Sequence, residues 1–207
     1  MSELCCRLCG SERLHVCLTL EHAPRNIQRL LTREQLTEDS AITLNVYQCR
    51  ECGLVQLAQT LEPEYYDDYI MTASHSPQMQ FYQRSQAFNF VSRFGLAGKR
   101  VIEIGCGDGN YLQYLREAGA IANGVEPSRI FRKMAQERGF QVIEGYVSRE
   151  WLIPGYPYDA FVTRQVLEHV SDPNDFLQGI RQALYGGGDR LGRGAQSGTN
   201  FRGGPLL

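Results

Sequence analysis

Two pairs of cysteines in the sequence have the spacing of metal ligands. Cys6 and Cys9 form the first pair, Cys49 and Cys52 form the second, and both follow the pattern Cys-x-x-Cys-Gly. The two thiolates of such a pair turn toward one ion, and the glycine after them permits the turn that N–H···S hydrogen bonds require. Four thiolates in tetrahedral geometry suit Zn²⁺, so these cysteines are the predicted ligands of one zinc ion.

The predicted zinc would have a structural role. All four ligands come from the protein, so no position stays open for water or a substrate. Residues 1–60 offer little core, and zinc can contribute on the order of 10 kcal/mol to the folding of such a module. Cys5 would point elsewhere in such a turn, and Cys17 is expected in the core. The alternative is that the four cysteines are incidental hydrophobic residues, but chance rarely produces the same pattern twice.

A glycine-rich loop is the second candidate site. The segment Glu103–Gly109 (EIGCGDG) follows an apolar run at 100–104 and leads directly into a helical pattern at 110–119. Glycines let the backbone approach a ligand where a Cβ would collide, and the N–H groups at the start of a helix suit a carboxylate. Glu126 ends the next apolar run, where a carboxylate can accept hydrogen bonds from both hydroxyls of a ribose.

The spacing of these glycines differs from the dinucleotide-binding fingerprint. That fingerprint needs G-x-G-x-x-G/A, whereas here the third glycine comes one residue early and Asn110 holds the required position. The pattern is instead G-x-G-x-G after an acidic residue. A tight turn that binds no ligand is the alternative, but the acidic residues on both sides of the loop favour a binding site.

The elements around this loop alternate between strands and helices. Apolar runs predict strands at 100–104, 121–126, 140–145 and 158–163, and helical patterns cover 110–119, 128–138 and 172–184. This alternation predicts an α/β fold with a parallel sheet and helical crossovers. Upstream, residues 1–60 have the short alternations of a β-rich module. A helix is expected from Pro77 to Gly95, with Phe81, Phe88, Val91 and Phe94 on its buried side.

Composition narrows the class of protein. The net charge of −2 and the interspersed acids and bases argue against a nucleic-acid partner. No apolar run approaches the roughly 20 residues of a membrane span, and the N-terminus lacks the apolar stretch of a signal peptide. The seven cysteines are an odd number, which argues against a disulfide framework. A cytoplasmic protein without a membrane or nucleic-acid partner is therefore expected.

The glycine loop and the segment Arg164–Pro173 (RQVLEHVSDP) together resemble the class I methyltransferases. The resemblance implies a partial Rossmann-like parallel sheet that binds S-adenosyl-L-methionine (SAM). It implies that cofactor contacts come from Glu103, Gly105, Cys106, Gly107, Gly109, Glu126, Pro127, Tyr146 and Gln165. Tyr146 would lie near the adenine and Gln165 near the methionine end. Cys106 is expected to fill the turn as a small residue, with redox control as the alternative, and His169 is expected to be structural.

The whole arrangement resembles the sugar C-methyltransferases over residues 5–184. It combines the two cysteine pairs, the continuation CGLVQL after the second, and an acidic and aromatic segment at 61–76. The resemblance implies methylation of a carbon beside the ketone of a nucleotide-linked keto-deoxysugar. It implies that Tyr69 approaches this small-molecule substrate, with packing in a domain interface as the equal alternative.

The resemblance also implies a division of the chain into four parts. They are a zinc-binding module at 1–60, a linker and helix at 61–98, an incomplete SAM-binding Rossmann-like domain at 99–186 and an irregular glycine-rich tail at 187–207. The family's catalytic base follows the fifth strand, beyond the residues present, so little methyl transfer is expected from this chain alone. A small-molecule O- or N-methyltransferase and a non-catalytic remnant that binds zinc and SAM are the alternatives.

The tail at 187–207 departs from the family's pattern. It stands where a fifth strand is expected, yet it is rich in glycine and contains no Val, Ile, Glu or Lys. Reading the possible codons of Asp189–Gln196 one base later gives an apolar run that ends in Glu-Val-Pro. We therefore expect a shift of the reading frame here, with a native flexible tail as the alternative. Without a fifth strand, residues 158–163 would form an exposed edge of the sheet.

Overall fold

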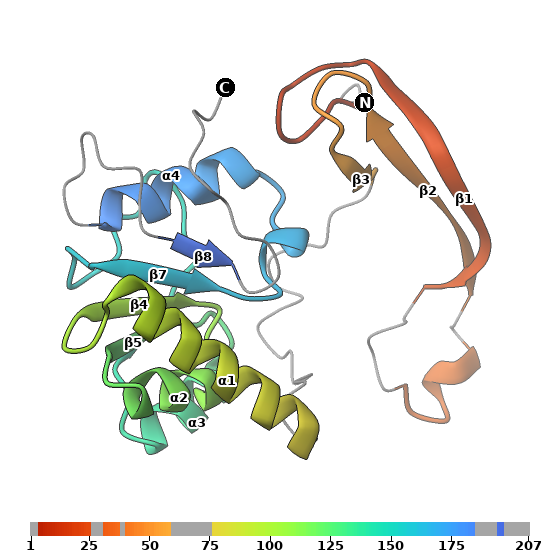
Figure 1. Ribbon diagram of the computed structural model, residues 1–207. Helices are drawn as coiled ribbons and strands as arrows, with labels where there is room; N and C mark the ends of the chain where they lie inside the picture. The colour runs from red at the N-terminus through yellow and green to blue at the C-terminus, as the bar shows by residue number, and fades with distance from the viewer. Residues whose placement is uncertain (1–3, 26–30, 38–39, 59–75, 185–193, 197–207) are drawn as a thin grey trace. The chain divides into compact units, whose positions relative to one another are not determined.

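The computed structural model describes residues 4–25, 31–37, 40–58, 76–184 and 194–196 (Figure 1). They belong to two compact units, the first comprising Met1–Leu61 with Ser171–Pro173 and the second Glu62–Val170 with Asn174–Leu207. Each unit is considered by itself below. None of the helices within the described ranges is both long and apolar enough to cross a membrane.

The first unit is built on a three-stranded antiparallel sheet with the strand order β1-β2-β3. Its strands are β1 (Leu14–Pro24), β2 (Ala41–Cys49) and β3 (Val55–Leu57), and a short 3-10 helix, η1, covers Gln35–Thr37. The register pairs Leu14 with Cys49 and Tyr47 with Gln56. These strands confirm the β-rich character expected for this part of the chain.

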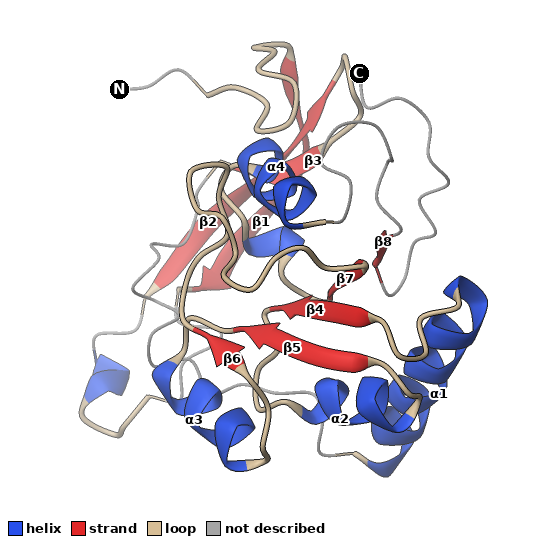
Figure 2. Ribbon diagram, turned by 90° about the vertical axis from the view of Figure 1, so that its left-hand side faces the viewer, coloured by secondary structure: helices blue, strands red, loops and turns tan. Residues whose placement is uncertain are grey.

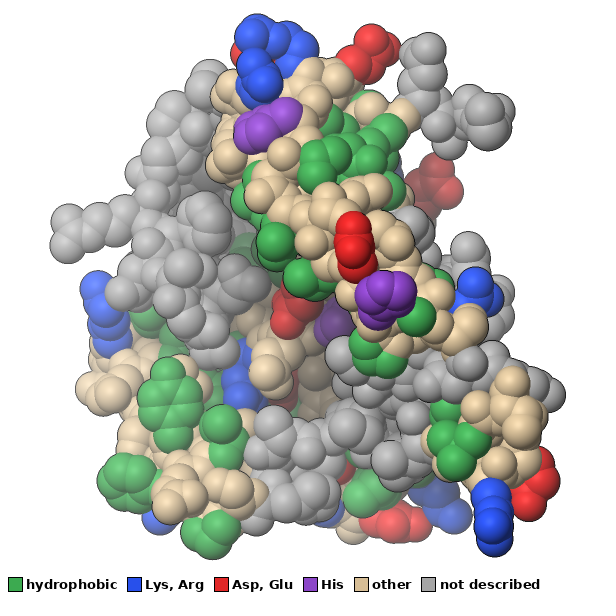
Figure 3. All heavy atoms as spheres, turned by 90° about the vertical axis from the view of Figure 1, so that its right-hand side faces the viewer, with side chains coloured by type: hydrophobic (Ala, Val, Ile, Leu, Met, Phe, Trp, Pro, Cys, Tyr) green, Lys and Arg blue, Asp and Glu red, His purple; other side chains and the backbone are tan. Residues whose placement is uncertain are grey.

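The sheet of the first unit exposes apolar side chains, and Cys17 is among its exposed residues. Leu18 and Leu20 of β1 are 50% and 45% exposed. Hydrophobic side chains are also visible on the face of the molecule that Figure 3 shows. The register of β1 and β2 shifts between Val16 and Leu18, and Cys17 lies at this shift with its thiol directed at the carbonyl of Val46. The expectation that Cys17 is a core residue is therefore wrong, because the irregular register leaves it exposed.

The second unit contains a parallel five-stranded sheet with the order β6-β5-β4-β7-β8. In chain order the strands are β4 (Arg100–Ile104), β5 (Ile121–Val125), β6 (Val142–Ile143), β7 (Ala160–Thr163) and β8 (Gly194–Gln196). The helices are α1 (Pro77–Phe94), α2 (Asn110–Glu117), α3 (Arg129–Glu137), η3 (Leu167–His169) and α4 (Pro173–Ala183). The expected alternation of parallel strands and helices is confirmed.

Helices cover both faces of this sheet, with α1, α2 and α3 on one side and α4 on the other (Figure 2). The central strand β4 contributes to both cores. Val101 packs with residues of α1 and α2, whereas Ile102 and Ile104 pack with residues of α4. Because side chains alternate along a strand, Glu103 shares the face of Val101 and is a charged group on a buried strand.

Helix α1 has the expected bounds, and Val91 and Phe94 pack inward as expected, but the other two residues predicted on the buried side do not. Ser76 caps its start through a bond from the Met79 N–H, and Gly95 ends it in the left-handed conformation. The buried residues are Gln83, Ala87, Phe90 and Val91. Phe81 and Phe88, expected on the buried side, are 76% and 41% exposed. They lie two helical turns apart on one stripe, and the opposing row of residues packs inward instead.

The tail is not entirely irregular. Gly194–Gln196 form β8 and pair in parallel with Phe161–Thr163 of β7. The expectation that β7 forms the edge of the sheet is therefore wrong, and so is that of a tail without regular structure. A parallel ladder is made by backbone groups, so residues of low strand propensity can still extend a sheet. The other residues of 187–207 lie outside the described ranges, and the shifted reading frame stays a prediction.

Candidate functional site

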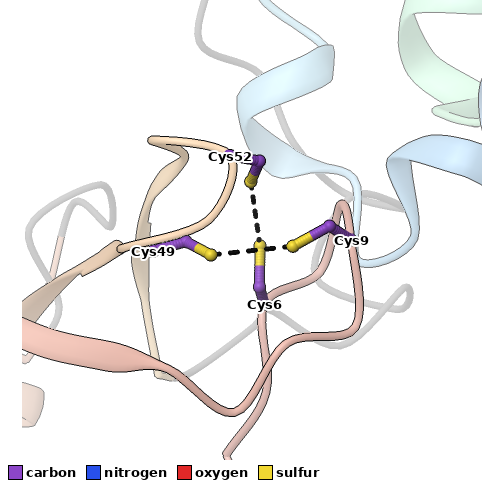
Figure 4. A group of neighbouring side chains, drawn as sticks. All are labelled: Cys6, Cys9, Cys49 and Cys52. Atoms are coloured by element: carbon purple, nitrogen blue, oxygen red, sulfur yellow. Dashed lines mark hydrogen bonds between the residues drawn. The ribbon is translucent and has the colours of Figure 1, made fainter. Parts of the chain in front are cut away.

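The four predicted zinc ligands lie together in the first unit. Their sulfur atoms are all within 4.8 Å of one another, and the side chains of two separate turns point toward a common centre (Figure 4). The Sγ atoms of Cys6 and Cys52 are 3.5 Å apart, and those of Cys9 and Cys49 are 3.6 Å apart. A tetrahedral zinc with Zn–S bonds of about 2.3 Å would place its sulfurs about 3.8 Å apart. The cluster therefore fits a zinc ion with only small adjustments.

The backbone of both turns has the conformation expected after a Cys-x-x-Cys pair. Gly10 and Gly53 have φ angles of 74° and 77°, the left-handed conformation expected after each cysteine pair. In the second turn the N–H of Glu51 donates to the Sγ of Cys49 at 3.4 Å. The N–H groups of Cys52 and Glu51 lower the pKa of the Cys49 thiol to about 6. Against the backbone N–H groups of Ser11 and Leu54, burial and the neighbouring thiols raise the pKa values of Cys9 and Cys52, so Cys49 is the thiol of the cluster that the backbone favours as a thiolate.

Gln56 links the two cysteine turns and was not identified from the sequence. This side chain of β3 is buried, and both ends of its amide form hydrogen bonds with the first turn. Its Oε1 accepts from the N–H of Arg7 at 2.9 Å, and its Nε2 donates to the carbonyl of Cys5 at 2.9 Å. Gln56 thereby fixes the first turn against the strand that follows the second turn. The sequence offered one indication of this role: Gln56 is the only polar side chain among the apolar residues of the segment 54–57.

The three glycines of the loop after β4 have different surroundings. Gly105, Gly107 and Gly109 all have positive φ angles, of 73°, 53° and 78°. A Cβ on Gly105 would collide with Val166, and one on Gly109 would lie 2.9 Å from the Cβ of Ala135. A Cβ on Gly107 would meet no atom within 4 Å. Gly105 and Gly109 are therefore required for packing, whereas Gly107 faces open space in which a ligand could approach the backbone.

Glu126 holds this loop against the end of β5. Its Oε2 accepts from the N–H of Gly107 at 2.7 Å, and its Oε1 accepts from the N–H of Ser128 at 2.9 Å. Burial raises the pKa of Glu126, while these two N–H groups and the charge of Arg132 act in the opposite direction. Each carboxylate oxygen has two lone pairs, so both can accept a further hydrogen bond from a ligand.

Asp108 occupies part of the helix start that was expected to receive an anion. Its Oδ1 accepts from the N–H of Asn110 at 3.1 Å, and its Oδ2 lies 3.2 Å from the guanidinium of Arg138. The loop thus supplies its own carboxylate at the beginning of α2. One N–H group of this helix start is therefore already bonded, which the sequence pattern did not indicate.

Glu103 is a buried acid with an unsatisfied oxygen. Its Oε1 lies 4.0 Å from the guanidinium of Arg164, and its Oε2 has no hydrogen-bond partner. Burial raises the pKa of Glu103 to about 8; the charge of Arg164 opposes this shift, and Glu126 and Asp108 add to it. A buried carboxylate oxygen without a partner indicates a position where a donor from a ligand fits.

The other predicted cofactor residues lie in the loops around the same sheet. Cys106 is buried against Gly124, where an added Cβ would collide with its sulfur, and burial raises its pKa well above the usual value. This supports a packing role for Cys106. Gln165 has a φ of 54°, which costs about 1 kcal/mol for a residue with a side chain and is typical of functional loops. Pro127 follows Glu126, and Tyr146 is exposed after β6.

Only some of the residues predicted to bind the cofactor or the substrate are brought together by the contacts described above. Glu103, the glycine loop and Glu126 lie at the carboxyl ends of β4 and β5, and the contact of Gly105 with Val166 adds the segment after β7. This is the edge where ligands of parallel sheets bind. His169 belongs to η3. Tyr69 lies outside the described residues.

Replacing Gln56 tests whether it stabilises the cysteine turns. Gln56→Ala leaves the Arg7 N–H and the Cys5 carbonyl without their partner, so we expect the free energy of unfolding of the first unit to fall by about 1–3 kcal/mol. Chemical denaturation measures this change, and zinc should be released to a chelator at a lower chelator concentration. Gln48→Ala, on the neighbouring strand, is the control; equal effects of the two substitutions would contradict the proposed role.

Two family profiles match the sequence of this chain, and one relative is similar to most of it. A profile described as "Methyltransferase domain" matches residues 79–191, which are more than half of the 207 residues, and one described as "Putative zinc binding domain" matches residues 6–66. The C-methyltransferase NovU of Streptomyces niveus is 27% identical over 185 residues, which cover 86% of this chain and 44% of NovU.

Other relatives match over a shorter stretch of the chain. The ubiquinone biosynthesis O-methyltransferase of Actinobacillus pleuropneumoniae serotype 5b (strain L20) is 32% identical over 100 residues, covering 44% of this chain and 43% of that protein. The chain thus spans less than half the length of these two relatives. The crystal structure of magnesium protoporphyrin IX methyltransferase from Synechocystis PCC 6803 with bound SAM matches with a TM-score of 0.44 and 21% identity, over 52% of this chain and 55% of that chain. On the profile match to more than half of its residues, the chain belongs to the methyltransferase domain family.

Proposed function

We propose that the second unit binds SAM at the glycine loop and forms the cofactor-binding part of a methyltransferase for small molecules. The observation that carries this proposal is the grouping at one sheet edge of open space at Gly107, the fixed carboxylate of Glu126 and the unsatisfied Oε2 of Glu103. These three features match an extended ligand with a ribose in its middle and a charged amino group at one end.

Each residue has a distinct proposed role toward this cofactor. Glu126 accepts hydrogen bonds from the ribose hydroxyls with the lone pairs that Gly107 and Ser128 leave unused. Glu103 receives the ammonium group of the methionine part through Oε2. Pro127 and Tyr146 flank the adenine. Gln165 lines the methionine end together with Gly105 and Cys106, and Gly109 lets the start of α2 pack closely against α3.

When bound, SAM supplies an electrophilic methyl group on a sulfonium. The residues described here would orient it and exclude water from one side, which lowers the barrier by positioning the two reactants. The substrate residues are a separate part of the proposal. Tyr69 is the proposed contact to the acceptor, on the resemblance to the sugar C-methyltransferases.

The acceptor that we favour is the carbon beside the ketone of a nucleotide-linked keto-deoxysugar. The match to NovU supports it, because that match covers 86% of this chain and so includes residues of both units. An O-methyltransferase is the second candidate, since relatives with this activity in their names reach 32% identity, but over only 44% of the chain. A non-catalytic role would show cofactor binding without any methyl transfer to either class of acceptor.

We also propose that Cys6, Cys9, Cys49 and Cys52 hold a structural zinc ion. The distances between their sulfurs and the N–H···S bond in the second turn support this role. With four protein ligands the ion would organise the turns that flank the sheet of the first unit, and it would take no part in the reaction.

Metal analysis of the purified chain tests the zinc site. We expect about one Zn²⁺ per chain, and we expect Cys52→Ser to lower this content strongly because it removes one of four ligands. Cys17→Ser is the matched control, since Cys17 is exposed and outside the cluster. Wild-type protein that contains no zinc and keeps a folded first unit would contradict the proposal.

Calorimetric titration with SAM and S-adenosylhomocysteine tests the cofactor site. We expect binding by the wild-type chain, and we expect Glu126→Ala to weaken it by about 1–3 kcal/mol because the ribose hydroxyls lose their acceptor. Glu137→Ala, an exposed acid of α3, is the control. Thermal unfolding separates lost binding from lost folding. Tighter binding of NAD than of SAM by the wild-type chain would overturn the proposed function.

A further inference from the structure

The side chain of Arg164 lies between Glu103 and the aromatic ring of Tyr111. Arg164 is the first residue after β7, Glu103 belongs to β4 and Tyr111 to α2. The guanidinium carbon is 4.0 Å from the centre of the Tyr111 ring, and one guanidinium nitrogen is 4.0 Å from Oε1 of Glu103. The side chain of Arg164 is only 13% exposed. Three elements of the second unit thus meet at this arginine.

Glu103 lies in surroundings that disfavour its negative charge. It is buried, its Oε2 has no partner, and the carboxylates of Asp108 and Glu126 are near enough to raise its pKa. Asp108 is paired with Arg138, and Arg132 is the cation beside Glu126. Among the described residues, Arg164 is therefore the cation whose charge favours the ionised form of Glu103. Burial and the charge of Glu103 raise the pKa of the Tyr111 phenol, which is therefore neutral.

Arg164 places a positive charge beside the carboxylate of Glu103 without forming a hydrogen bond to it. A separation of 4.0 Å is an ion pair but exceeds the length of a hydrogen bond, so the lone pairs of Glu103 remain available to a ligand. The ring of Tyr111 fixes the plane of the guanidinium through a cation–π contact. Arginine keeps its charge at any pH of interest, which a lysine in a buried site does not.

We propose that Arg164 is a positioning residue that favours the ionised form of Glu103 and thereby sets the affinity of the site for a ligand with a charged amino group. This inference rests on the proposed SAM site. A protonated Glu103 must lose its proton before it can pair with an ammonium group, so affinity falls as the pH decreases through the pKa of Glu103 in the free protein. Removing Arg164 raises that pKa, and the loss of affinity then begins at a higher pH.

Calorimetric titration of the full chain with S-adenosylhomocysteine, between about pH 6 and about pH 9.5, tests this coupling. We expect the ratio of wild-type to Arg164→Gln affinity to rise as the pH is lowered and to become constant below the wild-type pKa of about 8. Each pKa unit that Arg164 contributes makes this plateau tenfold higher. The ligand's own titration cancels, because the same ligand is used with both proteins. A purely structural effect would give a ratio that does not change with pH.

Methylthioadenosine, which lacks the amino-acid end, is the control ligand. We expect its affinity to be the same for the wild type and Arg164→Gln at every pH. Arg164→Lys lacks the planar contact to Tyr111 and carries a charge only below the pH at which a buried ammonium loses its proton, so it should restore the wild-type affinity in the lower part of the pH range only. It also serves as the test variant if thermal unfolding shows that Arg164→Gln is not folded.

A ratio for S-adenosylhomocysteine that is constant over the pH range would overturn the role of Arg164 and leave the SAM site standing. If Arg164→Gln weakened the binding of S-adenosylhomocysteine and of methylthioadenosine equally, the role of Arg164 would likewise be overturned. Failure of the wild-type chain to bind either ligand at any pH would instead overturn the proposed function, and this inference with it.

Discussion

The candidate site depends on the hydrogen bonds that the buried carboxylate of Glu126 accepts from Gly107 and Ser128. They connect the loop after β4 to the turn after β5, at distances of 2.7 and 2.9 Å. A buried carboxylate is costly unless its oxygens are bonded, and ordering a glycine-rich loop costs conformational entropy. Each therefore stabilises the other. The open space at Gly107 exists because this bond sets the path of the loop.

The two sites use glycine for different physical reasons. Gly10 and Gly53 follow the cysteine pairs with positive φ angles and have open space where a Cβ would lie, so their role is conformational. Gly105 and Gly109 are additionally confined by Val166 and Ala135, so their role is also close packing. In each case the glycine lies beside a polar group that a ligand or ion can use, and the rest of the unit keeps this group in place.

The sequence predicted the parts of the structure that depend on local pattern. The bounds of β4 and α1 and the pairing of two cysteine turns follow from apolar runs, caps and spacing. The contacts of Gln56 and Arg164 could not be predicted, because their partners lie far away in the sequence and are neighbours only after the sheets form. The face that α1 buries, the exposure of Cys17 and the pairing of β8 likewise depend on packing and register, which single-residue propensities do not encode.

The central claim is that the glycine loop is the place where the cofactor binds. NMR spectra of the chain labelled with ¹⁵N at glycine alone test it directly, because the loop and the cysteine turns each contribute glycine signals. On addition of S-adenosylhomocysteine, the account predicts large shifts of the Gly105, Gly107 and Gly109 amides and none of Gly10 or Gly53. Saturating ligand that leaves the three loop signals unchanged, or that shifts only the signals of the first unit, would contradict it.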